Sequence, residues 1–398
     1  MTATTLDYGS ADPLVLEAAT GGSIVDCRGP EGVGGAAATR LVEAAIDAPP
    51  QGPPLGAHVV AGDRVVVAVC GAVPQAEAVV AAVAGRLTAA GIAADDVQVL
   101  RAGPWDGDID GPAVAGTVEF DPAAAETTAY LAADEAGRPL YLARELVDAD
   151  VVVAVGAWGW NAALGGRALA GELWPSFSRQ ECRRDLTRSL ARRGRHALPD
   201  WKSAVQEVAW QLGVCASLRL VPGRAGAIHA ACFGLPDEAG RRARDAASAW
   251  CPHVAEAADL VIASVSDPAG GFGMVTRAVA AAARVVRPGG TICVASRVST
   301  GPGVVFLRWR QGAPLEGLVH EALATHDAAL VAEALETRLF ARGLGDNRLV
   351  LLSDIEESTV EELGFGHAAG PEVVERLAHR ADRIVVLHEA DLMLPRLG

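Results

Sequence analysis

The sequence predicts an α/β protein of two domains, each a parallel or mixed sheet flanked by helices. The chain has 398 residues, which is more than one hydrophobic core usually serves. Short apolar runs such as 65–70 and 151–156 alternate with amphipathic stretches such as 75–91. Strands that are apolar on both faces are typical of parallel sheets covered by helices on both sides. We therefore expect an N-terminal domain over 1–252 and a C-terminal domain over 253–398.

The order of the expected elements supports this class. A connection rich in proline and glycine (43–64) precedes a βαβ unit made of strand 64–71, helix 75–91 and strand 96–103. Further strands are expected at 151–156, 217–223, 226–234, 259–266, 291–299, 348–353 and 383–390, and further helices at 200–213, 237–250, 273–290, 314–323, 327–342 and 371–380. Ligands of such sheets bind beyond the carboxyl ends of the strands. We therefore expect a site among the loops after 70, 103, 156, 266 and 296.

The charge of the chain limits its partners. A net charge of −15 argues against a general affinity for nucleic acid or for an anionic membrane. Residues 179–195 are positively charged instead, because they contain seven arginines and only two acidic residues, Glu181 and Asp185. This segment is either a solvated helix face or inter-domain surface, or a local site for an anionic group or an acidic partner.

Cysteine usage and the N-terminus predict a cytoplasmic protein. The seven cysteines are scattered, without a Cys-x-x-Cys pair, which indicates reduced thiols and no zinc site. The first ten residues lack the basic and apolar regions of a signal peptide, and no uncharged apolar run reaches membrane-spanning length. We therefore expect neither secretion nor insertion into a membrane.

Few motifs in the sequence carry chemistry by themselves. The nine histidines occur singly, and the chain has neither a Gly-x-Ser-x-Gly nor a phosphate-binding loop with lysine. Cys70 closes a strand, where a thiol is either buried and inert or faces a cleft. The stretch 259–296 resembles the second half of class I methyltransferases, but the glycine-rich loop that those enzymes need upstream is absent.

Three longer segments, taken in order, resemble the nickel-pincer lactate racemases. The stretch 45–103 is similar to a family pattern of a strand ending in Asp-x-Thr-Arg-Pro, a helix, and a strand ending in Gly-Thr-His. The stretch 137–171 resembles a family segment that ends in Gly-x-Ser-Gly-Gly-x-Lys. The stretch 257–306 resembles the second-domain core, where a lysine-bearing helix leads to Gly-Gly-Thr-Ile. The resemblance covers most of the chain and implies the two-domain lactate-racemase fold.

The resemblance also implies a chemistry. Members of that family hold a nickel-bearing, pyridinium-derived cofactor between the domains, tethered by a lysine and bound through its metal by a histidine. Two further histidines exchange a proton while a hydride passes from C2 of a 2-hydroxy acid to the cofactor and back. Racemisation needs such acid/base groups on opposite faces of one carbon, with pKa values near neutrality.

Matched residue by residue, this chemistry is missing from the first domain. The arginine of Asp-x-Thr-Arg-Pro becomes Val73, and the histidine of Gly-Thr-His becomes Trp105. Counted back from Gly165 and Gly166, the second proton-transfer histidine falls at or beside Trp158.

The positions that would hold the cofactor have also changed. The tethering lysine falls on Ala168, one residue past Arg167, and an arginine cannot replace it because its guanidinium stays protonated. The nickel histidine would lie at 182–184, where Cys182 is the only conceivable ligand. The second-domain lysine falls on Arg277, where the positive charge is retained.

Three hypotheses follow for this sequence. The first is a lactate-racemase-like protein with a degenerate or rebuilt site, which binds a small ligand or an intact paralogue and forms homo- or hetero-oligomers. The second is a racemase or epimerase of a 2-hydroxy acid that holds the nickel-pincer cofactor without a tether. The third is a methyltransferase-like transferase. The expected ligand-binding residues are Cys70, Trp105, Trp158, Trp160, Gly165, Gly166, Arg167, Ala168 and Arg277.

Overall fold

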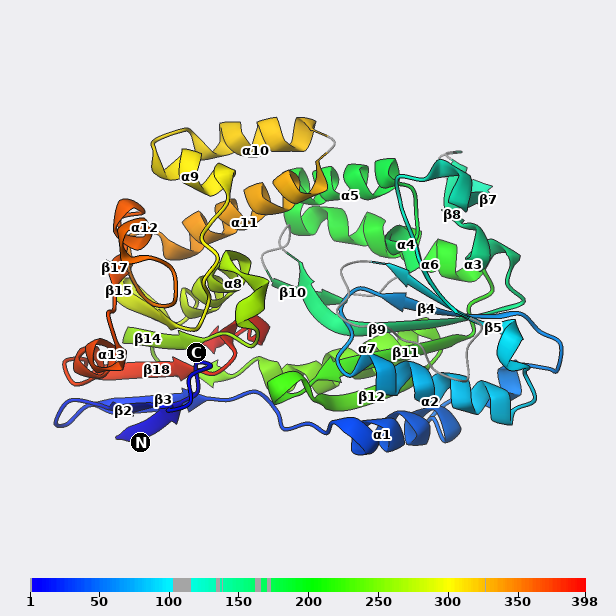
Figure 1. The fold of residues 1–398 in the computed structure, drawn as a ribbon, viewed down its shortest axis with the longest axis horizontal. Helices are drawn as coiled ribbons and strands as arrows, with labels where there is room; N and C mark the ends of the chain where they lie inside the picture. The colour runs from blue at the N-terminus through cyan, green and yellow to red at the C-terminus, as the bar shows by residue number, and fades with distance from the viewer. Residues whose placement is uncertain are drawn as a thin grey trace. The chain divides into compact units, whose positions relative to one another are not determined.

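The computed structural model describes residues 2–102, 116–133, 137, 139–161, 166–169, 173–325 and 327–398. The chain divides into two compact units. Unit 1 comprises Met1–Pro30 and Ser248–Gly398, and unit 2 comprises Glu31–Ala247. Each unit is built on an extended sheet flanked by helices (Figure 1). The predicted α/β class is confirmed.

Unit 2 is built on a mixed sheet. Its strands lie in the order β12-β11-β9-β4-β5-β6, with β10 paired to β9. Strands β11, β9, β4, β5 and β6 run parallel, while β12 and β10 are antiparallel to their neighbours. The strands are β4 (Val65–Cys70), β5 (Val97–Ala102), β6 (Thr117–Glu119), β9 (Val151–Asn161), β10 (Gly166–Leu169), β11 (Ala216–Pro222) and β12 (Ile228–Gly234).

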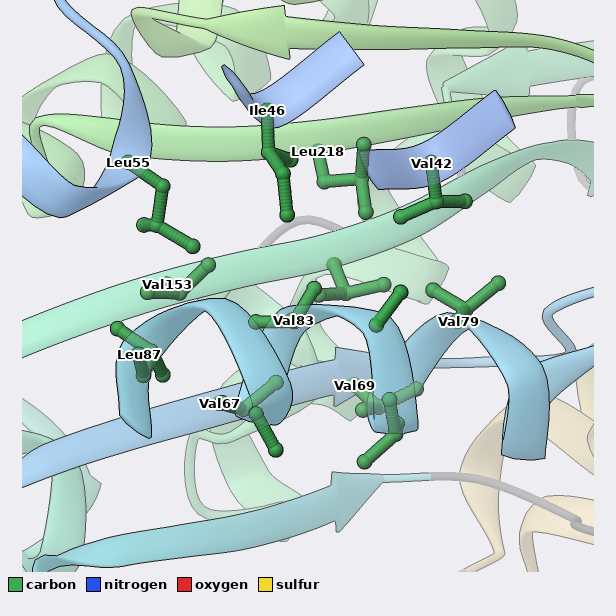
Figure 2. Packing of buried hydrophobic residues seen from close by; sticks show 14 of the residues in the cluster. Val42, Ile46, Leu55, Val67, Val69, Val79, Val83, Leu87, Val153 and Leu218 are labelled. Atoms are coloured by element: carbon green, nitrogen blue, oxygen red, sulfur yellow. The ribbon is translucent and has the colours of Figure 1, made fainter. Parts of the chain in front are cut away.

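The burial of the central strand β4 shows that both faces of this sheet are covered. All six of its residues are buried. Successive side chains of a strand point to opposite faces, so burial of all six means that both faces are covered. Val65, Val67 and Val69 enter one core together with helices α1 (Gly35–Asp47) and α2 (Ala76–Ala89). Figure 2 shows this core, where Val79, Val83 and Leu87 follow one another at helical spacing along α2.

The opposite face of β4 carries Val66, Ala68 and Cys70 into a second core. The described residues that cover this face include side chains from the hairpin β7 (Thr128–Ala133)–β8 (Pro139–Ala143) and from helices α3 (Arg144–Asp148), α4 (Leu173–Ser176) and α6 (Leu198–Gln211). Helices α5 (Gln180–Arg193) and α7 (Pro236–Ala246) complete the helices described in unit 2.

Unit 1 is built on a parallel sheet in the order β17-β16-β15-β14-β18-β3. Its strands are β3 (Ser23–Cys27), β14 (Ala258–Ser264), β15 (Val286–Ala295), β16 (Arg348–Leu352), β17 (Gly366–His367) and β18 (Arg383–Leu387). The hairpin β1 (Ala3–Leu6)–β2 (Leu14–Glu17) and the short pair β13 (His253–Val254)–β19 (Arg396–Leu397) lie outside this sheet. The helices are α8 (Phe272–Ala282), α9 (Val304–Arg310), α10 (Leu315–Ala324), α11 (Ala328–Leu344), α12 (Glu357–Glu362) and α13 (Pro371–Ala378).

The sequence-based division at 252 places the first 30 residues in the N-terminal domain, whereas in the structure they belong to unit 1 with residues 248–398. Strand β3 instead pairs in parallel with β18, with Cys27 opposite Leu387. The hairpin β1–β2 buries Leu6, Leu14 and Leu16 in the core that contains Ile24 and Ile384. Pairing between residues more than 350 positions apart leaves no local pattern in the sequence, so periodicity alone does not locate it.

Two element boundaries also differ from the sequence-based expectations. The helix expected at 273–290 ends at Ala282, and β15 begins at Val286. Gly289 has φ of +71° within this strand, a conformation that glycine adopts without strain. The strand expected to end at 156 continues to Asn161 and pairs with β10. Within the described part of the chain, no helix is both long enough and apolar enough to cross a membrane.

Candidate functional site

Within the glycine-rich stretch after 156, β10 pairs antiparallel with the last residues of β9. In the β10 register, Ala168 lies opposite Gly159 and Leu169 lies opposite Trp158, while Arg167 lies opposite Trp160. Trp158 is half-buried. Trp105 and Gly165, two of the expected ligand-binding residues, lie outside the described residues.

Cys70 and Cys182 differ in burial. Cys70 ends β4 with a fully buried side chain in the second core of unit 2, and its Sγ lies 3.8 Å from the carbonyl oxygen of Ala68. Of the two sequence-based interpretations, the structure shows the buried thiol. Cys182 is half-buried in the first turn of α5 and stands next to Arg183.

The described residues offer few of the side chains that a lysine-tethered nickel cofactor would use. Nowhere in the described part of the chain do three His, Cys, Asp or Glu side chains gather as metal ligands. Nickel is commonly held by imidazole and thiolate ligands, whereas Cys182 has arginines at 183 and 184 as its neighbours in sequence. The chain has one lysine, Lys202, which is exposed on α6.

Unit 1 presents a polar cluster where β14 and β18 end. The chain leaves β14 towards β15 on one side, while β18 lies on the other side of β14. Such a switch point is where open parallel sheets bind ligands. Here the Asp391 carboxylate accepts hydrogen bonds from the Ser266 backbone N–H (2.7 Å) and hydroxyl (2.6 Å), and the Ser264 hydroxyl accepts one from the backbone N–H of Glu389 (3.1 Å). These contacts join the two loops of the switch point.

Arg277, predicted as a ligand-binding residue, lies beside this cluster. It projects from α8, and its Nη2 lies 3.4 Å from Oε1 of Glu336 on α11. Burial raises the pKa of Glu336, and the lowering by Arg277 does not cancel this. Burial likewise raises the pKa of Asp391 against the hydrogen bonds from Ser266 and the field of Arg277. Arg277 therefore acts on two carboxyl groups whose pKa values burial raises.

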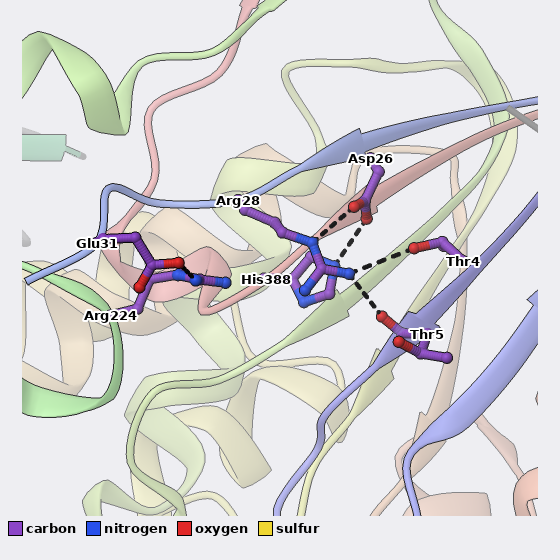
Figure 3. Close-up of polar contacts among 7 residues, drawn as sticks. All are labelled: Thr4, Thr5, Asp26, Arg28, Glu31, Arg224 and His388. Carbon is purple, nitrogen blue, oxygen red and sulfur yellow. Dashed lines mark hydrogen bonds and ion pairs between the residues drawn. The ribbon is translucent and has the colours of Figure 1, made fainter.

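A second polar cluster lies where β3 and β18 end (Figure 3). His388 and Asp26 are nearly buried, with side-chain exposures of 8% and 11%, and His388 Nε2 lies 2.8 Å from Asp26 Oδ1. Arg28 donates from Nε to Asp26 Oδ2 (2.7 Å) and from Nη2 to the carbonyl oxygen of Thr5 (3.0 Å). Burial by itself raises the pKa of Asp26, but the hydrogen bonds from His388 and Arg28 outweigh it and leave that pKa below its ordinary value.

The sequence analysis missed this second cluster, although a signal existed. Each of the runs 23–27 and 383–387 is followed directly by a polar residue, Arg28 and His388. The pairing of β3 with β18, which brings Asp26 to His388, is a tertiary event that the sequence pattern does not contain.

Comparison with solved structures defines the class of this fold. The chain is similar to the lactate racemase apoprotein from Thermoanaerobacterium thermosaccharolyticum, with a TM-score of 0.71 and 15% identity over 99% of this chain and 100% of that one. It is also similar to a Thermotoga maritima protein solved by structural genomics, with a TM-score of 0.60 and 12% identity over 84% of this chain and 94% of that one. No protein-family model and no curated protein matches the sequence. The fold is lactate-racemase-like.

Proposed function

We propose that this protein binds a small carboxylate-bearing ligand, of the size of a 2-hydroxy acid, at Arg277, and that its site is a rebuilt form of the lactate-racemase site without racemase activity. The observation that supports this proposal is the exposure of the Arg277 guanidinium and its distance from Glu336. It is about one-third exposed, with a side-chain value of 31%, and its contact with Glu336 is long at 3.4 Å. A charge-assisted pair usually closes to about 2.8 Å, and we propose that a ligand carboxylate competes with Glu336 for this fork.

The chemistry of arginine supports a carboxylate as the ligand. The guanidinium is planar and always charged, and it matches a carboxylate through two parallel hydrogen bonds. Burial raises the pKa of both Glu336 and Asp391, the two carboxyl groups on which Arg277 acts. The switch point beside it is the part of the sheet where ligands of such folds bind.

The residue types at the family's reactive positions support binding rather than racemisation. Tryptophan at 105 and 158 offers no group that exchanges protons near neutral pH, and Ala168 offers no nucleophile for a tether. The retained charge at Arg277 agrees with a ligand that keeps the carboxylate of the family's substrates.

The alternative is a racemase or epimerase that holds a nickel-pincer cofactor without a lysine tether. The likeness to a lactate racemase apoprotein over the whole length of both chains favours it. In the family that the fold suggests, this group supplies a hydride acceptor.

One experiment separates the two. Protein purified from its own host is analysed for nickel by mass spectrometry and for a chromophore by absorbance, then titrated calorimetrically with L-lactate, D-lactate and pyruvate. Racemisation is followed by chiral chromatography. Binding of a carboxylate without nickel, chromophore or racemisation supports the proposal. Stoichiometric nickel with racemisation contradicts it and favours the alternative, and heat from S-adenosyl compounds alone favours the transferase.

The variant Arg277→Gln tests the residue directly. We expect the dissociation constant for the bound acid to rise roughly 10- to 100-fold, because a hydrogen bond to a charged group contributes about 1.5–3 kcal/mol. Arg342→Gln is the matched control, since Arg342 pairs with Glu316 on an exposed surface of the same unit. Equal affinity of the two variants would exclude Arg277 as the anchor. Co-purification of an intact paralogue from the same host would extend the proposal to a hetero-oligomer.

A further inference from the structure

Two buried polar side chains of unit 2 lack hydrogen-bond partners. Glu238, in the first turn of α7, is 9% exposed, and Ser217, on β11, is fully buried. Oε1 of Glu238 and Oγ of Ser217 have no hydrogen-bond partner among the residues that the structure describes. Buried polar groups are nearly always paired, because desolvation without a partner is costly, and the cost is largest for a charged group such as a carboxylate.

Gly234, the last residue of β12, brings these two side chains to one place. It lies directly opposite Ser217 in the antiparallel pair of β11 and β12. Residues paired in this way project from the same face of a sheet, with Cβ atoms about 4.5–5.5 Å apart. A Cβ added to Gly234 would lie 3.6 Å from Oε2 of Glu238 and 3.9 Å from the carbonyl oxygen of Gln51. The space that this glycine leaves is therefore bordered by a carboxylate, a backbone carbonyl and a hydroxyl.

The positive charge nearest to Glu238 along α7 is used elsewhere. Arg242 follows Glu238 by four residues, the spacing at which glutamate and arginine often pair on a helix. Its Nη1 instead donates to the carbonyl oxygen of Phe233 at 3.2 Å. The neighbouring carboxylate shows the contrast, since Asp237 is exposed and accepts hydrogen bonds from Nε2 of Gln206 at 3.1 and 3.2 Å.

We propose that Glu238, Ser217 and the carbonyl oxygen of Gln51 bind a monovalent metal cation beside Gly234. Hard cations prefer oxygen ligands, and each of the three groups supplies an oxygen. A single carboxylate balances one positive charge, whereas Ca²⁺ sites gather several carboxylates. In the part of the chain that the structure describes, no three His, Cys, Asp or Glu side chains come together in that way.

The site joins segments that are far apart in the sequence. Gln51 lies in the connection rich in proline and glycine that follows α1, while Glu238 begins α7, which packs on β11 and β12 (Figure 1). The cation holds this connection to the end of β12, which is the edge strand of the unit 2 sheet. The site lies wholly in unit 2 and does not depend on the ligand proposed for Arg277.

Binding is measured on the full-length protein by thermal unfolding in the chlorides of potassium, sodium and tetramethylammonium at constant ionic strength. Tetramethylammonium is the reference, because its methyl groups keep its charge away from oxygen ligands. We expect potassium or sodium to raise Tm with a saturating dependence on concentration, as a ligand of the folded state does. The ion with the larger effect is the one that the site selects. Anomalous scattering from crystals grown with thallium(I) should place the ion beside Glu238.

Two substitutions in the first turn of α7 decide whether Glu238 is responsible. Glu238→Gln keeps the shape and removes the charge, so the affinity for the cation should fall at least about 10-fold. In tetramethylammonium the Tm of Glu238→Gln should equal or exceed that of the parent, because an unpaired buried charge is removed. Asp237→Asn removes an exposed charge from the same turn and should respond to cations as the parent does. Ser217→Ala removes one of three ligands and should bind with intermediate affinity.

Four results would overturn the site. They are a Tm that is the same in all three salts, a response that is unchanged in Glu238→Gln, an equal loss of response in Glu238→Gln and Asp237→Asn, or a larger effect of magnesium or calcium than of either monovalent ion. A Tm of Glu238→Gln that falls equally in every salt would make Glu238 a packing residue of α7 instead.

Discussion

Replacement of Asp26 by asparagine tests the cluster that holds the N-terminal strand to unit 1. The amide keeps the shape of the side chain but removes the charge, and its NH₂ faces a donor at either His388 Nε2 (2.8 Å) or Arg28 Nε (2.7 Å). Breaking a buried, hydrogen-bonded charge pair costs about 3–5 kcal/mol. Arg28 is 39% exposed, so water can solvate its guanidinium when the Asp26 charge is removed. We therefore expect the lower end of this range, about 3 kcal/mol.

The assay is urea unfolding followed by circular dichroism at pH 7, with tryptophan fluorescence, to which Trp250 contributes, as a second probe. Trp250 is fully buried in unit 1 and its ring contacts Gly29, three residues after Asp26. Asp354→Asn is the control, since Asp354 pairs with Arg297 at 2.9 Å on a more exposed surface of the same unit. An exposed pair contributes about 0–1 kcal/mol.

The same substitution has a pH signature with a definite sign. A carboxyl group whose pKa is lowered in the folded state stabilises the protein above its unfolded pKa, and this stabilisation is lost as the pH falls through the folded value. The parent should therefore lose stability below about pH 4 relative to Asp26→Asn, and the two curves should converge in acid. Equal costs of Asp26→Asn and Asp354→Asn at pH 7 would refute the reasoning.

The remaining predictions concern two glycines and one buried acid. In Gly29→Ala the new Cβ would overlap the fully buried Trp250 ring, so unfolding should become easier by about 1–3 kcal/mol with a shift in Trp250 emission. Gly85→Ala in α2, where a Cβ meets nothing within 4 Å, should stabilise the protein by about 0.5–1 kcal/mol. Urea unfolding measures both variants, and a change in the free energy of unfolding with the same sign for Gly29→Ala and Gly85→Ala would contradict these predictions. Burial raises the pKa of Glu336, so its effect on stability is most favourable below its unfolded pKa and declines as the pH rises through the folded value. Glu336→Gln should therefore gain stability over the parent at pH 8 relative to pH 4, and a gain that does not vary with pH would contradict this assignment.

Several features of the site are readable from sequence because they are local. The apolar run at 65–70 is β4, with every side chain buried as continuous hydrophobicity predicts. Counting from a glycine pair predicts Arg277 as a ligand-binding residue; the structure shows its neighbours Glu336 and Asp391, and its role in binding stays a prediction. The cluster of arginines at 179–195 is also visible in the sequence, which leaves open a solvated face or inter-domain surface and a site for an anionic group or an acidic partner.

The sequence by itself determined the α/β class, the strand and helix periodicity of both halves, and the residue types available for chemistry, because each of these follows from neighbours in the chain. Only the tertiary structure decided that residues 1–30 complete the sheet of unit 1, that Asp26 meets His388, and that Arg183 is half-buried while Arg192 is exposed. The physical reason is the same in all three cases. Strand pairing, desolvation and charge compensation depend on which distant segments pack together, and that choice is made by the whole chain at once.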